Sequence, residues 1–166
     1  LSPVTATELP LPVIPAAPAT LDIQAIAATP ADRPAQVLPV LSGGDTIVSW
    51  DFKGAYTDNP ELMAKAQGEI SRLSGLLSTA TSSKMILSVG VANQYELLGD
   101  GEKQYEYLKR AIQTGSRDGL PWHNLGVLME RLGALRTARV AYEQATVLQP
   151  QLEVYQYAYL QFLIQY

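Results

Sequence analysis

The sequence predicts an all-α protein, a short solenoid of antiparallel helical hairpins that comes after an extended Pro/Ala-rich arm with one candidate β-strand. Three observations lead to this prediction. Residues 59–166 divide into six segments with apolar residues at 3–4 spacing, separated by short turns. The same part of the chain repeats itself with a period of 34 residues. Eight of the eleven prolines fall within residues 1–40, and they interrupt this stretch too often for a helical spacing of apolar residues.

Composition narrows the classes of function. The chain has 166 residues, a formal net charge of −4 and 47% hydrophobic residues, which suits one globular domain with a tail. The acidic balance argues against nucleic-acid binding, which needs a basic surface. The absence of cysteine and the single histidine exclude thiolate catalysis, cysteine-ligated metals and any site that needs two imidazoles from one chain. We therefore expect a binding protein with no cofactor and no metal, and not an enzyme.

Residues 1–45 are expected to form the arm, largely in the polyproline conformation. Such a segment serves either as a spacer or as a docking arm that wraps a partner, and its composition leaves both interpretations open. A Pro/Ala-rich stalk before a compact domain is typical of the region after a cleaved signal or a membrane anchor. We therefore expect a membrane tether upstream of Leu1 as one option, and the composition favours the periplasm or cell envelope without establishing the compartment.

Residues 46–58 are predicted to be a strand with a linker after it. Alternation places Val48, Trp50 and Phe52 on one side of a strand over residues 46–52. A lone strand must pair elsewhere, and the edge of a partner's sheet is one candidate. These three residues are therefore predicted partner contacts. In the alternative interpretation the segment is merely extended and packs Trp50 and Phe52 onto the helices.

The helices are delimited by start and stop signals. Asn59-Pro60 begins the first, Gly99 ends the second, Asp100 caps the third, and Gly133 ends the fourth. The expected ranges are 59–80, 82–98, 100–114, 118–133, 134–148 and 152–166. Because 59–80 lies outside the 34-residue phase, we expect it to cover the exposed end of the first hairpin.

The repeat carries a specific pattern. Trp122, Leu125 and Gly126 have the spacing W-x₂-L-G, and an A-x₃-F…P pattern is completed by Ala138, Tyr142, Ala145 and Pro150. Residues 119–152 therefore resemble the tetratricopeptide repeat (TPR) family. Residues 85–118 are similar to a second, more divergent copy, and residues 153–166 to half a repeat.

The resemblance implies a non-catalytic protein–protein interaction domain whose first helices line a groove for a partner segment. Carried over to this chain, it implies a groove built from eight residues: Val89, Asn93, Glu96, His123, Val127, Glu130, Tyr157 and Gln161. The expected groove is apolar and mildly acidic, which suits an apolar or amphipathic protein segment. His123 has no carboxylate close to it in the sequence, so we expect it to contact a partner and not to transfer protons.

The last helix is apolar nearly all round. Its aromatic residues have 4-3-4 spacing along one side, and they are Tyr155, Tyr159, Phe162 and Tyr166. Because the ends of helical repeat arrays normally turn a polar face outward, this stripe is predicted to meet a partner or another copy of the chain. The alternative is that the aromatic face packs on helix 134–148.

Two functions from different classes agree with these patterns. In the first, the chain is an adaptor or assembly factor of a multiprotein complex, which binds a partner segment in its groove and docks or tethers through its arm. In the second, it is a structural subunit of a larger envelope, filament or secretion assembly, with arms exchanged between subunits.

Overall fold

The computed structural model describes residues 41–115 and 117–166. Most of the predicted arm, residues 1–40, lies outside the described residues, so the expected polyproline conformation is not addressed. Residues 41–45, also assigned to the arm from sequence, are described and belong to the folded part of the chain.

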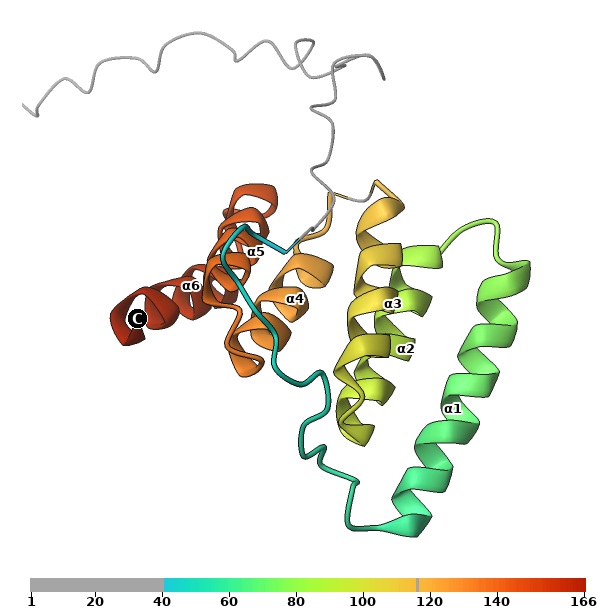
Figure 1. Ribbon diagram of the computed structural model, residues 1–166. Coiled ribbons are helices and arrows are strands. Elements are labelled where there is room, and N and C mark those ends of the chain that lie inside the picture. The colour runs from blue at the N-terminus through green and yellow to red at the C-terminus, as the bar shows by residue number, and fades with distance from the viewer. Residues whose placement is uncertain (1–40, 116) are drawn as a thin grey trace, which may run out of the picture. The chain divides into compact units, whose positions relative to one another are not determined.

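The described residues form an all-α structure of six helices (Figure 1). Their bounds are α1 (Pro60–Thr79), α2 (Lys84–Leu98), α3 (Gly101–Gln113), α4 (Leu120–Arg131), α5 (Leu135–Leu148) and α6 (Glu153–Gln165). All six predicted helices are confirmed, with ends shifted by a few residues.

The capping residues predicted from the sequence form hydrogen bonds or turns at the ends of the helices. The Asn59 side chain accepts hydrogen bonds from the backbone N–H groups of Glu61 and Leu62, both at 3.1 Å. The Asp100 carboxylate accepts from Lys103 N–H at 3.0 Å. Both caps satisfy amide groups that the first turn of a helix leaves without partners. Gly99 has φ of +83°, a left-handed conformation that favours glycine at the end of a helix.

Helices that are consecutive in the chain pack against one another, most extensively α2 with α3 and α4 with α5. A short turn joins the two helices within each of these pairs, so each pair is a hairpin-like unit (Figure 1). In the α4–α5 pair, a Cβ atom on Gly126 would lie 2.7 Å from the Tyr142 ring. The glycine therefore allows the two helices to approach closely.

The core preserves the 34-residue period. Positions that coincide after this shift are buried in both copies: Val91 with Leu125, Leu108 with Tyr142, and Ala111 with Ala145. α1 packs on α2, as expected for a helix that covers the first hairpin. The repeat seen in the sequence thus corresponds to equivalent packing positions in the two hairpins.

The predicted strand over residues 46–52 is wrong. Among the described residues there is no strand, and Asp51 makes only an isolated antiparallel bridge with Asp100. The bridge consists of bonds from Phe52 N–H to the Gly99 carbonyl and from Gly101 N–H to the Trp50 carbonyl, both 3.0 Å. The backbone partner is the α2–α3 turn, which is too short to extend a ladder.

Residues 41–56 form an extended segment, here called the belt, that crosses the helices (Figure 1). Ile47, Trp50 and Phe52 pack against the core, whereas Val48 is 96% exposed. The alternation that predicted one shared face for Val48, Trp50 and Phe52 therefore fails. The alternative interpretation, in which Trp50 and Phe52 pack onto the helices, is confirmed.

The α2–α3 turn is shaped to receive the belt. A Cβ atom on Gly99 would overlap the carbonyl oxygen of Phe52, and one on Gly101 would overlap that of Trp50. On the belt itself, a Cβ atom on Gly54 would overlap the carbonyl oxygen of Leu97. Only glycine leaves room for two backbones to approach this closely.

Candidate functional site

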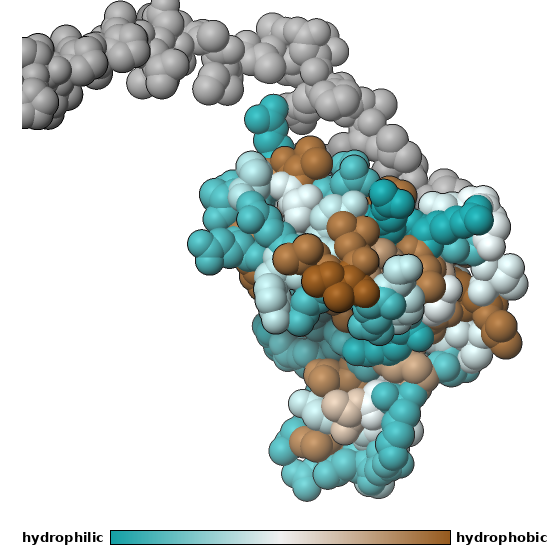
Figure 2. Space-filling view, turned by 90° about the vertical axis from the view of Figure 1, so that its left-hand side faces the viewer, coloured by the Kyte–Doolittle hydropathy of each residue, from teal (hydrophilic) through white to brown (hydrophobic). Residues whose placement is uncertain are grey.

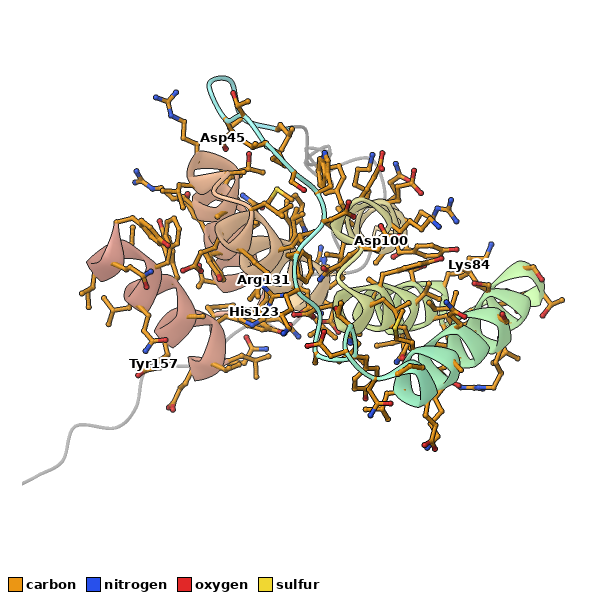
Figure 3. All side chains as sticks on the ribbon, turned by 60° about the horizontal axis from the view of Figure 1, so that its bottom comes forward. Asp45, Lys84, Asp100, His123, Arg131 and Tyr157 are labelled. Carbon is orange, nitrogen blue, oxygen red and sulfur yellow. The ribbon has the colours of Figure 1, made fainter. Side chains whose placement is uncertain are left out.

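The candidate functional site is a groove of about 680 Å³ between α4 and α6. It contains five of the eight residues that the TPR resemblance assigned to a partner-binding groove: His123, Val127, Glu130, Tyr157 and Gln161. His123 and Tyr157 are labelled in Figure 3 on the two helices that border it.

Helical spacing explains the α4 side of the groove. His123, Val127 and Glu130 are separated by four and three residues, so they share one face of α4. After the 34-residue shift, His123 coincides with Tyr157 and Val127 with Gln161. The two helices therefore present equivalent positions to the groove.

Glu130 is the one acidic residue that lines the groove, and it is already engaged. The Tyr142 hydroxyl of α5 donates a hydrogen bond to Glu130 Oε2 at 2.7 Å. Burial raises the pKa of Tyr142 well above its ordinary value, and the bond to Glu130 raises it further. Tyr142 thus stays protonated and continues to donate to the carboxylate.

His123 lies among aromatic rings at the inner end of the groove. Its ring centroid is 5.2 Å from that of Tyr155 and 5.9 Å from that of Tyr142. Burial lowers the pKa of His123, so the imidazole is neutral at pH 7. Its Nδ1 is buried and makes no hydrogen bond with the described residues. These aromatic rings provide apolar contact for the imidazole.

The α6 side is polar at its edge and apolar along its length. The Gln161 amide donates a hydrogen bond to the Tyr157 hydroxyl at 2.8 Å, and both residues are exposed. Leu160 and Ile164 also line the groove, and they are 55% and 78% exposed. A segment bound here would therefore meet aliphatic and aromatic surface with few charges.

The three groove residues expected on α2 do not line this groove. Val89 is buried with 3% exposure, so it is part of the core. Asn93 is exposed and accepts a hydrogen bond from the Asn124 amide at 3.1 Å. Glu96 forms an ion pair of 3.0 Å with Arg131. These last two contacts join α2 to α4 beside the groove.

The aromatic stripe of α6 mostly faces inward. Tyr155 is 6% exposed and Phe162 is 4% exposed, and Tyr159 packs against the same core. Tyr166 is 59% exposed, and its ring lies 5.2 Å from that of Phe162. The expectation that the whole stripe meets a partner is therefore wrong, because Tyr155, Tyr159 and Phe162 pack against the core, as the alternative interpretation proposed.

Sequence reasoning missed several residues of the groove: Tyr142, Ala158, Leu160, Ile164 and Gln165. Ile164 had a usable signal, since it coincides with Glu130 after the 34-residue shift. Tyr142 had none, because its contact with Glu130 depends on how α5 packs against α4.

Within the described ranges there is no cluster of three or more histidine, cysteine, aspartate or glutamate residues that could hold a metal ion. None of the helices that the structure describes is long and apolar enough to cross a membrane. No family model, curated protein or solved structure matches the chain.

Proposed function

We propose that the chain is a non-catalytic protein–protein interaction module of the TPR type, a short α-solenoid that acts as an adaptor or assembly factor. The observation that carries the proposal is the groove between α4 and α6, which brings together five of the eight residues that the TPR resemblance implies for a partner-binding groove. Its lining is apolar and aromatic with one engaged carboxylate, which suits an apolar or amphipathic protein segment.

The repeat supports the TPR assignment. The two hairpin-like units bury equivalent positions, and Gly126 allows the close approach that the small residue of W-x₂-L-G implies. The binding of a partner segment by the groove, and docking or tethering through the N-terminal arm assigned from the sequence to residues 1–45, are part of the same proposal.

The belt favours a chain that packs residues 46–52 onto its own helices over one that exchanges them with a neighbouring subunit. Trp50 and Phe52 make their backbone bonds and ring contacts within their own chain, including an Arg131 guanidinium 4.6 Å from the Phe52 ring centroid. The backbone hydrogen bonds and ring contacts of the belt therefore do not require a neighbouring subunit.

Selection with a random peptide library displayed on phage, using the full chain as bait, tests this function. Selected peptides are synthesised and their affinity is measured by fluorescence anisotropy. Tyr157→Ala and Gln161→Lys should each weaken binding at least about tenfold, because they remove contact area or place a charge in an apolar groove.

Gln67→Lys is the matched control for Gln161→Lys, since Gln67 is an exposed glutamine on α1 away from the groove. It should leave the affinity unchanged. A selection that yields no reproducible peptide, or peptides that bind all three variants equally well, would contradict the proposal.

A further inference from the structure

Among residues 41–115 and 117–166, the outer face of α6 has no partner, and it carries almost no charge. Beyond Glu153 the helix contains no charged side chain. Its exposed apolar residues are Val154, Tyr157, Leu160, Leu163 and Ile164, with exposed fractions from 46% to 78%. Figure 2, which views the molecule from the side on which α6 lies in Figure 1, shows apolar side chains gathered in a patch.

The repeat phase identifies the equivalent of this face in the preceding hairpin. On α4, Trp122, Gly126 and Met129 are buried, and Gly126 faces the Tyr142 ring of α5. After the 34-residue shift these positions become Gln156, Leu160 and Leu163 of α6, and all three are exposed.

The inward face of α6 shows the same correspondence. Leu125 and Leu128 of α4 coincide with Tyr159 and Phe162 of α6, and all four pack in the core. α6 thus occupies the place of a first hairpin helix, and its exposed face is the one that a second helix, antiparallel to it, covers in the α4–α5 unit.

We infer that this face binds the α6 helix of a second copy of the chain, in an antiparallel pair about a two-fold axis. A two-fold axis perpendicular to a helix places its copy antiparallel, which is the arrangement within the hairpins. Two identical faces repel each other when they carry like charges. The outer face of α6 has no charged side chain between Val154 and Ile164, so two copies of it can pair without repulsion. Leu160 and Leu163 lie at the centre of the pair.

The size of the patch sets the strength of the association. Of the exposed apolar residues, Leu160 and Leu163 lie at the centre of this face and Ile164 lies beside it, so the pair buries less than the about 800 Å² per partner of a standard interface. We therefore expect a reversible dimer whose population depends on concentration. The pair extends beyond the proposed function, because Leu163 and Gln156 do not line the groove, whereas Leu160 belongs to both surfaces.

The absence of cysteine from the sequence allows a direct test. Leu160→Cys introduces the single thiol of the full chain, next to the proposed axis, and mild oxidation should give a covalent dimer. Ile86→Cys is the control, since Ile86 is 54% exposed on α2, away from α6. It should stay largely monomeric under the same oxidation.

Light scattering across concentrations from about 1 μM to about 1 mM gives an independent measurement. The wild-type mass should rise toward that of a dimer. Leu160→Lys/Leu163→Lys should weaken the association at least about tenfold, whereas Ile86→Lys should not. Circular dichroism verifies that the variants keep their helicity, which exposed positions permit.

Three results would overturn the inference: a monomer throughout this range, a dimer that persists in Leu160→Lys/Leu163→Lys, or equal oxidation to dimer of both cysteine variants. The groove hypothesis is judged separately from the peptide affinity of Tyr157→Ala and Gln161→Lys. Either proposal can therefore fail while the other stands.

Discussion

Replacing Asp45 by alanine should destabilise α5, although the two lie about 90 residues apart in the sequence. α5 begins after Ala134, which offers no capping side chain. The Asp45 carboxylate supplies the cap instead, with one oxygen 3.3 Å from Arg136 N–H and the other 2.7 Å from Thr137 N–H (Figure 3). The Thr137 hydroxyl, in a side chain that is 3% exposed, donates a further bond to Asp45 at 2.7 Å.

The magnitude is set by these bonds. Loss of a side-chain cap costs about 0.5–2 kcal/mol, and this one also leaves the Thr137 hydroxyl without its acceptor, so we expect about 1.5–2 kcal/mol. For a domain of this size that loss lowers Tm by roughly 4–8 °C. Asp51→Ala is the matched control, since Asp51 is exposed and the hydrogen bonds of its bridge with Asp100 come from the backbones of Trp50 and Phe52.

The same cap should depend on pH. Partial burial acts to raise the pKa of Asp45, but the hydrogen bonds from Thr137 and Arg136 outweigh it and hold the pKa below its ordinary value. A carboxyl whose pKa is lower in the folded state stabilises the fold above its unfolded pKa, and this contribution is lost as the pH falls through the folded pKa. The difference in Tm between wild type and Asp45→Ala should therefore be full near pH 6 and shrink as the pH falls below about 4.

Thermal unfolding monitored by circular dichroism at several pH values measures both effects. Equal Tm values for Asp45→Ala and Asp51→Ala at pH 6 would refute the assignment of Asp45 as the cap of α5. A difference that stays constant down to about pH 2 would show that the carboxylate charge does not stabilise the helix.

Two further predictions concern packing. Gly126→Leu should unfold or loosen the α4–α5 pair at a cost of about 3 kcal/mol or more, because even a Cβ atom at this position would lie 2.7 Å from the Tyr142 ring. Calorimetry measures this loss of stability. An unchanged Tm would count against the close approach of the two helices. We expect the free energy of unfolding in urea to be about 3–5 kcal/mol higher for a chain that begins at residue 41 than for one that begins at residue 57. Only the longer chain keeps the half-buried Ile47, Trp50 and Phe52 of the belt. Equal free energies of unfolding would show that the belt does not stabilise the helices.

Local chemistry predicted the helices well. Asn59 and Asp100 act within three residues of themselves, and Gly99 adopts the left-handed conformation in which its own backbone ends α2. The 34-residue period predicted the equivalent buried positions, because the two helices of each hairpin pack against each other through side chains at the same positions of the repeat. The TPR resemblance implied the α4 side of the groove, where the residues share one face of a single helix.

The α6 helix shows where periodicity stops being informative. Its residues are apolar on most sides, so no pattern distinguishes the face that packs inward from the face that stays exposed. The structure buries Tyr155 and Phe162 and exposes Leu160 and Ile164. The shape of the preceding hairpin distinguishes the two faces, and that shape has no signature within α6.

The sequence by itself determined the number, order and approximate ends of the helices, because these depend on contacts between residues a few positions apart. Only the tertiary structure decided the course of the belt, the cap that Asp45 provides for α5, and the joining of α4 and α6 into a groove. These features depend on contacts between residues tens of positions apart, such as Asp45 with Thr137. Such contacts arise when the assembled hairpins present surfaces that fit, and no local pattern encodes that fit.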